Sequence, residues 1–200
     1  MSHLDRILHD GIDREGWKLA RKPCVGASDA AKLARESSVE SVLASKLTNS
    51  DWGGNGYTEQ GHRWEPMMLA WAGISPNIAL IHAPNNRGFA ATPDGVDATR
   101  GAECKAKHNK VVTGPTLGEW RQVAWQFVVV PEFEEIEFIW QELVTDPNNG
   151  EWIPRASEPK NLTIRRNDPK IADLTAKILP LATDLLARLT LARSYERPTS

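Results

Sequence analysis

Residues 91–107 read ATPDGVDATRGAECKAK, a Pro-Asp-Gly turn at Asp94 followed by the charged residues Glu103 and Lys105. Small or apolar residues alternate with Glu103, Lys105 and Lys107, and this period of two predicts a β-strand with the three side chains on one face. The turn would place Asp94 across from them on a neighbouring strand. The stretch therefore predicts that two carboxylates and an ammonium group lie close together.

The expected neighbourhood of Asp94, Glu103 and Lys105 suits a divalent cation. Two carboxylates within a few ångströms repel each other unless a cation lies between them. Oxygen ligands with room for water favour Mg²⁺, for which Mn²⁺ should substitute, and such an ion assists phosphodiester hydrolysis. Lys105 could orient or deprotonate the attacking water, or stabilise the charge that develops. The alternative is a simple turn at Asp94 beside an exposed, ion-paired strand.

Two further polar positions flank this stretch. Glu65, in EQGHRWEP, lies on a predicted helix over residues 58–71, from which a third carboxylate could reach the same site. Gln122 and Gln126 stand four apart and so share one face of the next predicted helix. A glutamine there could hold the nucleophile or the substrate phosphate. The alternatives are that Glu65 is a surface helix residue and that Gln122 is a helix-capping or core-edge amide.

The rest of the chain is expected to form helices and strands around these motifs. Ser28 is a candidate N-cap for a short helix. The C-terminal leucine series has helical spacing, with a kink expected at Pro180, and could form a subunit seam or lie on the core. The remaining predicted elements are strands over 78–82, 87–92, 101–107 and 134–144 and a helix over 116–130.

Composition bounds the class of protein. The chain has 200 residues, 40% of them hydrophobic and 25% charged, and shows no repeat or linker, so residues 1–200 are expected to form one domain. There is no apolar run long enough for a membrane span and no apolar block near the start, so a cytoplasmic location is expected. Cys24 and Cys104 are too few for a disulfide framework and are expected to be reduced.

The net charge of −2 is not typical of a nucleic-acid-binding protein, since duplex DNA favours a basic surface. If DNA is the partner, the basic surface must be local. Each short basic cluster could equally be a solvated face, and the candidates are Arg14, Lys18, Arg21 and Lys22; Lys105, Lys107 and Lys110; and Arg165 and Arg166. Trp52, in a glycine-rich stretch, is the best candidate for an aromatic wedge against a DNA end.

Five motifs in one order resemble a known family. They are GWKLARKPCVGASDAAKL, GHRWE, ATPDG, ECK and RQVAWQ, spread over more than half of the chain. Together they resemble the YqaJ and lambda exonuclease group of the PD-(D/E)XK nuclease superfamily. The resemblance implies an α/β, restriction-endonuclease-like core of helix, three strands, helix and strand, with additional N- and C-terminal helices.

The resemblance also implies roles for individual residues. Asp94 and Glu103 would be metal ligands together with the carbonyl of Cys104, and Glu65 would complete or support the site. Lys105 would be the catalytic lysine, and Gln122 matches the glutamine that the family carries on the helix after the strands. A pocket for the 5′-phosphate of a DNA end would be formed by Arg21, Ser28 and Thr92, a combination of guanidinium and hydroxyl groups that suits phosphate.

The expected function is that of a Mg²⁺-dependent 5′–3′ exonuclease that resects linear double-stranded DNA for recombination in a phage or prophage. Expected partners are duplex DNA ends, a single-strand annealing protein and further copies of the chain, since members of the family commonly form rings. Two alternatives stay open. One is an endonuclease on the same fold, and the other is a non-catalytic DNA-binding or host-interaction protein.

Overall fold

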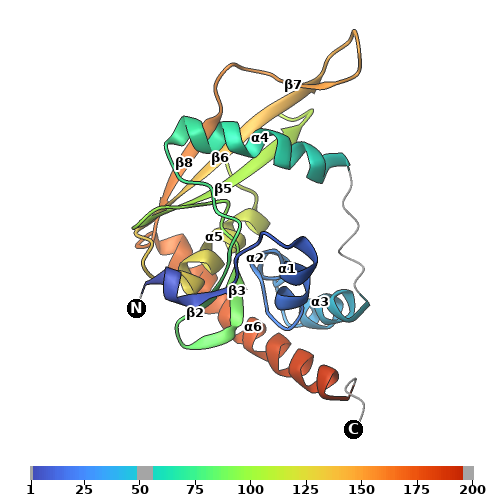
Figure 1. The fold of residues 1–200 in the computed structure, drawn as a ribbon, viewed down its shortest axis with the longest axis vertical. Helices are drawn as coiled ribbons and strands as arrows, with labels where there is room; N and C mark the ends of the chain where they lie inside the picture. Colours follow the sequence, from blue (N-terminus) through green and yellow to red (C-terminus); the bar gives the residue numbers. More distant parts are fainter. Residues whose placement is uncertain (1, 49–55, 196–200) are drawn as a thin grey trace.

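The computed structural model describes residues 2–48 and 56–195, with side chains in the first helix after the gap described from Arg63 onward. It is a mixed α/β structure with two sheets and surrounding helices (Figure 1). The N-terminal part consists of the 3₁₀ turn η1 (His3–Arg6), β1 (Ile7–His9), α1 (Arg14–Arg21), α2 (Ala27–Lys32) and α3 (Ser37–Thr48).

The smaller sheet contains the strands predicted over residues 78–82 and 87–92, which form a hairpin. Strands β2 (Leu80–Ala83) and β3 (Asn86–Ala91) are antiparallel, and the Asn86 side chain accepts a hydrogen bond from the Gly88 amide at the beginning of β3. Strand β1 adds to the other edge of β2, giving the order β1-β2-β3. The sequence predicted the hairpin but not its third strand, because pairing between segments about 70 residues apart leaves no local pattern.

The larger sheet carries the motif around Asp94. Its main path is β4 (Gly95–Val96), β5 (Arg100–His108), β6 (Glu135–Thr145) and β7 (Trp152–Pro154), and β8 (Lys160–Arg165) also pairs with β6. Strands β5 and β6 are parallel, so the chain crosses between them through α5 (Leu117–Val129). The predicted order of helix, three strands, helix and strand is present as α4 (Gly56–Ala72), β2, β3, β5, α5 and β6, with the short β4 as an additional strand between β3 and β5. Its strands are divided between the two sheets.

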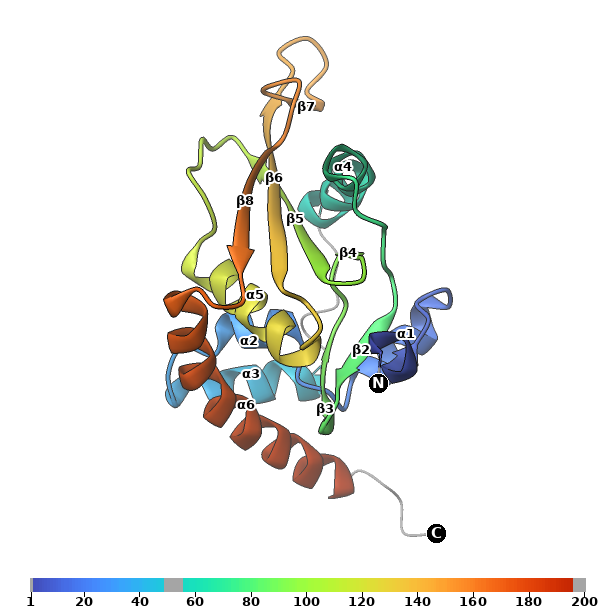
Figure 2. The same cartoon turned by 90° about the vertical axis from the view of Figure 1, so that its left-hand side faces the viewer.

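Helices cover both faces of the larger sheet (Figure 2). Met68 and Leu69 of α4 (Gly56–Ala72) pack with Cys104 and Ile139 on one face. On the other face Phe138 belongs to the main core together with α5 and α6. Burial on both sides explains why β6 is buried continuously over its middle.

The beginning of α2 differs from the sequence expectation. Its N-cap is Gly26, not Ser28, and Ser28 lies inside the first turn. The Asp29 carboxylate accepts a 2.8 Å hydrogen bond from the Gly26 amide and pairs with Lys46 of α3 at 2.9 Å. A side chain in the first turn thus supplies the cap, which frees the Ser28 hydroxyl for another contact.

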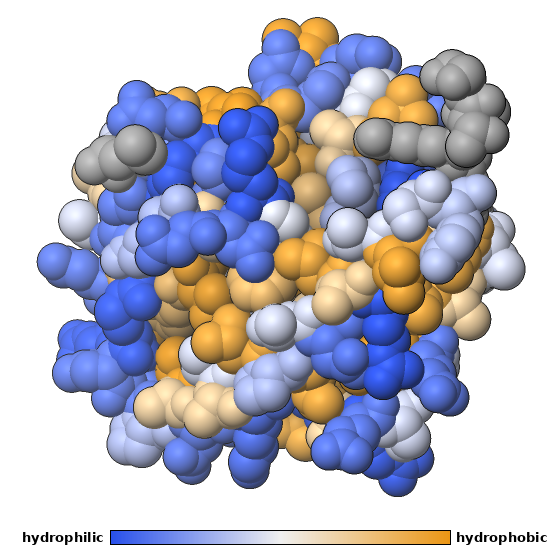
Figure 3. Space-filling view, turned by 90° about the horizontal axis from the view of Figure 1, so that it is seen from below, coloured by the Kyte–Doolittle hydropathy of each residue, from blue (hydrophilic) through white to orange (hydrophobic). Residues whose placement is uncertain are grey.

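The C-terminal helix α6 (Pro169–Tyr195) lies along the core and runs through Pro180 without interruption. The C-terminal leucine series packs against the core, and its buried residues include Ile171, Ile178 and Leu185. Viewed from the end of the molecule at which α6 lies, apolar patches alternate with hydrophilic side chains (Figure 3). Among the helices that the structure describes, none has the length and apolar character needed to cross a membrane.

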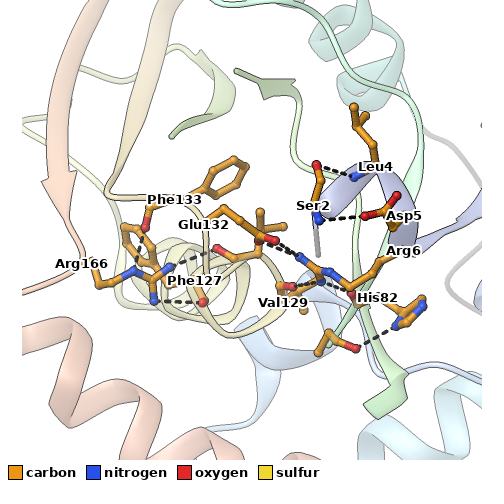
Figure 4. A network of polar contacts seen from close by, with 12 residues as sticks. Ser2, Leu4, Asp5, Arg6, His82, Phe127, Val129, Glu132, Phe133 and Arg166 are labelled. Atoms are coloured by element: carbon orange, nitrogen blue, oxygen red, sulfur yellow. Dashed lines mark hydrogen bonds and ion pairs between the residues drawn. The ribbon is translucent and has the colours of Figure 1, made fainter. Parts of the chain in front are cut away.

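Two arginines hold the end of α5 (Figure 4). Arg166 donates to the carbonyls of Phe133, Phe127 and Val130 at 2.7, 3.2 and 3.0 Å. From the N-terminal turn, buried Arg6 makes a two-pronged ion pair with Glu132 and donates to two further carbonyls. Arg166, named above as part of a basic cluster, therefore caps the Phe127 carbonyl in the last turn of α5 and ties it to the loop that follows.

Candidate active site

A cavity of about 290 Å³ opens where both sheets meet α1, α2, α4 and α5. Eight of the nine residues singled out in the sequence line it, from four helices, the segment between β3 and β4, and the middle of β5. They are Arg21, Ser28, Glu65, Thr92, Asp94, Glu103, Lys105 and Gln122. Cys104, the ninth, has its side chain in the cluster under α4. Arg21 and Gln122, about 100 residues apart in the sequence, thus contribute to a single concave site.

Asp94 is fixed at the junction of the turn and the sheet. Its amide donates to the carbonyl of Ala102 at 3.0 Å, and its carbonyl accepts from the amide of Asn77 at 2.9 Å. Strand β4 follows directly and pairs with Gly101 and Ala102 of β5. The Asp94 carboxylate therefore lies just before Gly95, the first paired residue of β4, and beside Cys104 of β5.

Glu103 and Lys105 lie side by side on the α5 face of β5, as the period of two predicts. Lys105 Nζ donates to Glu103 Oε1 in a short contact. The second oxygen of Glu103 accepts an equally short hydrogen bond from Nε2 of Gln126. The Glu103 side chain is almost fully buried, whereas that of Lys105 is about one quarter exposed. The Lys105 ammonium group is therefore anchored by a buried carboxylate and faces the cavity.

The charges of the site act on one another. Burial and then the carboxylates of Glu103 and Glu65 raise the pKa of Asp94 well above its ordinary value, against the opposing effects of Lys105 and the Cys104 amide. Burial alone would lower the pKa of Lys105, but Glu103 and Asp94 raise it above its ordinary value. Several negative groups thus share a poorly solvated space, an arrangement that a bound cation relieves.

Cys104 contributes its main chain to the site. Its amide donates a 2.7 Å hydrogen bond to Asp94 Oδ2. Because the N–H and C=O of one strand residue point to the same edge, the Cys104 carbonyl also points toward the Asp94 side of β5. The thiol lies on the opposite face, and burial, followed by the charge of Asp94, raises its pKa. Both cysteines are free thiols, as expected.

The oxygen atoms at this end of the cavity are of the type that a hard divalent cation prefers as ligands. Asp94, Glu103 and the Cys104 carbonyl offer oxygen atoms, which Mg²⁺ and Mn²⁺ prefer. Within residues 2–48 and 63–195, whose side chains the structure describes, no three His, Cys, Asp or Glu side chains form a ready-made metal cluster. Glu65 lines the cavity and acts on the charge of Asp94, but it does not close a three-carboxylate set in this arrangement.

The other end of the cavity is built by α1, α2 and the end of β3. The guanidinium of Arg21 donates to the Ser28 hydroxyl in a short contact and lies over the ring of Trp17, 5.2 Å from its centroid. Trp17 Nε1 donates to the Thr92 hydroxyl at 3.3 Å. The three residues expected to bind phosphate therefore converge, with Trp17 as the wall that joins them.

Helix α5 runs along the charged face of β5 and matches its spacing. Gln126 contacts Glu103, and Glu119, seven residues earlier, forms a short ion pair with Lys107. Two turns of helix, from Glu119 to Gln126, cover about 10.8 Å, and four strand residues, from Glu103 to Lys107, cover about 13 Å. The two distances are similar, so both contacts can form at once. Gln122, midway between the two contacts, lines the cavity next to Lys105.

Some residues of the site were missed or misjudged from sequence. Gln126 was noted as sharing a face with Gln122, but its contact with Glu103 was not predicted. Trp17 and Arg14 line the cavity as well, and the guanidinium of Arg14 lies 4.4 Å from the Trp17 ring centroid. The spacing of Arg14, Trp17 and Arg21, each one or two helical turns apart, was the available signal.

The tryptophans are mostly structural. Trp120 and Trp125 are buried in the core, whereas Trp71 is 42% exposed. Trp52, the expected aromatic wedge, lies outside the described residues.

Comparison with known proteins shows the fold. No model of a known protein family matches the chain, and no curated protein matches its sequence. The solved structure of LHK-Exo in complex with dAMP is similar over 91% of this chain and 97% of that chain, with a TM-score of 0.62 and 22% identity. A phage related exonuclease from Haemophilus somnus 129PT is similar over 85% and 96%, with a TM-score of 0.59 and 13% identity. The chain thus has the fold of these two exonucleases over nearly all of their length, and the resemblance to phage-type exonucleases is confirmed at the level of the fold.

Proposed function

We propose that the chain is a Mg²⁺-dependent DNA exonuclease of the YqaJ and lambda exonuclease group, with a PD-(D/E)XK core. The observation that carries the proposal is the convergence in one cavity of the Asp94, Glu103 and Lys105 set with the Arg21, Ser28 and Thr92 set. One end of the cavity suits a cation and the other suits a phosphate. A phosphodiester in the cavity could meet both at once. The shared fold with two exonucleases supports the proposal.

Asp94, Glu103 and the carbonyl of Cys104 would hold the metal ion, with Glu65 in support. When bound, the ion would supply Lewis-acid stabilisation of the negative charge on the phosphate. Lys105, anchored by Glu103, is placed to orient the attacking water or to stabilise the charge that develops at the phosphate. Gln122 lines the same space and offers an amide to the water or to a phosphate oxygen.

The pocket at Arg21 would set the polarity with which the proposed enzyme degrades a DNA strand. A guanidinium and two hydroxyl groups would bind the terminal 5′-phosphate, so that cleavage proceeds from the 5′ end and leaves a 3′ single strand. Such a product serves recombination, and the proposed setting is a phage or prophage acting in the host cytoplasm. A single-strand annealing protein and further copies of the chain are proposed partners.

The test uses linear duplex DNA and a covalently closed circle of the same sequence. With Mg²⁺, the intact chain should release nucleotides from the linear duplex, leave single-stranded DNA and spare the circle, and EDTA should stop the reaction. Labels at the 5′ and 3′ ends give the direction, since a 5′–3′ enzyme releases the 5′ label first. Mn²⁺ should replace Mg²⁺.

Other outcomes would point to the alternatives. Cutting of the closed circle would identify an endonuclease on the same fold. Duplex binding without cleavage at any enzyme or metal concentration would identify a non-catalytic DNA-binding protein. Release of the 3′ label first would contradict the role given to Arg21, Ser28 and Thr92.

A further inference from the structure

We infer that Gln126 is a positioning residue that holds Glu103 in the orientation required for metal binding, an inference that rests on the function proposed above. Gln126 is fully buried in α5 and donates through Nε2 to Glu103 Oε2. It does not belong to the lining of the cavity. Its action on the reaction would therefore pass through Glu103.

The contacts of Glu103 show what Gln126 adds. One oxygen accepts from Lys105 and the other from Gln126, so the carboxylate is held from both sides. Lys105 is anchored on the same strand and is partly exposed, whereas Gln126 belongs to a different element and is wholly enclosed. The bond from Gln126 is thus the one that fixes the carboxylate relative to the body of the protein.

The amide of Gln126 has one orientation that fits. An ionised carboxylate only accepts hydrogen bonds, so the NH₂ group must face Glu103, and a flipped amide would set two acceptors against each other. In the fitting orientation Gln126 Oε1 is buried and finds no hydrogen-bond partner among the residues that the structure describes. An apolar side chain would pack in this place without a buried unpaired oxygen, so packing alone does not explain a glutamine here.

Gln122 and Gln126 therefore have different tasks although they share a helix face. Gln122 lines the cavity and can meet substrate or water. Gln126 lies one turn further on, at Glu103, and the ion pair of Glu119 with Lys107 fixes the other end of the same face. Through these two contacts, helix α5 holds Glu103 and Lys107 on the charged face of β5 in place. Groups that orient a metal ligand in this manner typically change metal affinity or activity by about 10- to 100-fold when removed.

The chain offers a matched control. Gln141 of β6 is also buried, also leaves its Oε1 unpaired among the described residues, and donates to main-chain carbonyls of Glu142 and Ala156. It pairs in register with Ala106, whose side chain points to the α4 face, opposite to that of Glu103. Gln141→Met removes the same chemical group from the other side of the sheet.

The experiment compares the full chain with Gln126→Met and Gln141→Met, since methionine keeps the unbranched shape of glutamine without its donor. Mn²⁺ affinity is measured by calorimetry, the Mg²⁺ concentration for half-maximal cleavage of linear duplex by kinetics, and folding by Tm. Gln126→Met should weaken Mn²⁺ binding and raise the half-maximal Mg²⁺ concentration about 10- to 100-fold. Gln141→Met should leave both unchanged. If Gln126→Met does not fold, Gln126→Leu takes its place.

The results separate this inference from the proposed function. A folded Gln126 variant that binds Mn²⁺ as tightly as the unmodified chain overturns the inference, even if DNA cleavage is intact. If the unmodified chain binds Mn²⁺ but cleaves no DNA, the proposed function fails and the calorimetric comparison still decides the role of Gln126. An unmodified chain that binds no Mn²⁺ overturns the role given to Gln126 as well.

Discussion

The main-chain amide of Cys104 donates a 2.7 Å hydrogen bond to Oδ2 of Asp94. This bond ties the carboxylate that follows the turn to the strand that carries the other charged groups. It leaves the second carboxylate oxygen, Oδ1, for another ligand. The same bond also favours the ionised form of Asp94, against the burial and the neighbouring carboxylates that disfavour it. Asp94 is therefore held in a place that is unfavourable for its charge, and the proposed cation would offset this cost.

Asp94→Asn should abolish cleavage while the protein remains folded. The substitution keeps the shape of the side chain but removes the charge that the proposed metal site needs. Loss of one member of a preorganised charged set typically costs about 10²- to 10³-fold in rate. The measurement is the rate of release of labelled nucleotide from linear duplex in saturating Mg²⁺. Activity within a few fold of the unmodified chain would contradict the assignment.

The same substitution should stabilise the metal-free protein at neutral pH. The pKa of Asp94 is raised in the folded state, so folding favours the protonated form, and that stabilisation is lost as pH rises through the folded-state value. At neutral pH the ionised Asp94 carboxylate therefore lowers the free energy of unfolding, and asparagine removes this destabilisation. In EDTA, Tm of Asp94→Asn should exceed that of the unmodified chain, and the difference should shrink in acid. A lower Tm at neutral pH would contradict the electrostatic account.

Lys105→Met should stop hydrolysis but leave DNA binding in place. Methionine removes the ammonium group that contacts Glu103 and faces the cavity. The expected loss of rate is about 10²-fold or more, by the same reasoning about positioned charges. Lys110→Met is the control, because Lys110 is exposed just beyond β5. Equal losses in the two variants would show that general positive charge matters, not the position of Lys105.

Arg21→Ala should erase the preference for 5′-phosphorylated over 5′-hydroxyl ends. Hydrogen bonds to charged groups contribute about 1.5–3 kcal/mol, equivalent to a preference of roughly 10- to 100-fold. Lys18→Ala, on the same helix, is the control, because Lys18 pairs with Glu15 and does not belong to the cavity lining. The assay compares degradation rates of the two end types. If the unmodified chain degrades both equally, the phosphate pocket is wrongly assigned.

Arg166→Ala and Arg165→Ala should separate two neighbouring arginines by role. Arg166 donates to three carbonyls around the end of α5, and its loss should reduce the free energy of unfolding by about 2–4 kcal/mol, since the Phe127 and Phe133 carbonyls then lose this donor. Arg165, whose side chain is 73% exposed, should change it by less than about 0.5 kcal/mol. Urea unfolding measures both. A larger effect for Arg165 would contradict this division.

The sequence by itself determined the local features of this chain. Alternation in residues 101–107 predicted that Glu103 and Lys105 share a strand face, and the hydrogen bond between them agrees. The hairpin around Asn86 and the helix before Pro131 were also predictable. These features follow from local periodicity and turn chemistry, which are set by neighbours in the chain.

Only the tertiary structure decided which groups meet across the fold. The contact of Gln126 with Glu103 depends on how α5 crosses β5, and the approach of Arg21 to Thr92 depends on how α1 packs beside β3. Sequence spacing gives the face of a helix or strand but not the neighbour that this face will meet. That choice depends on burying apolar surface from distant segments at once, and the cavity with its shared charges is a consequence of that packing.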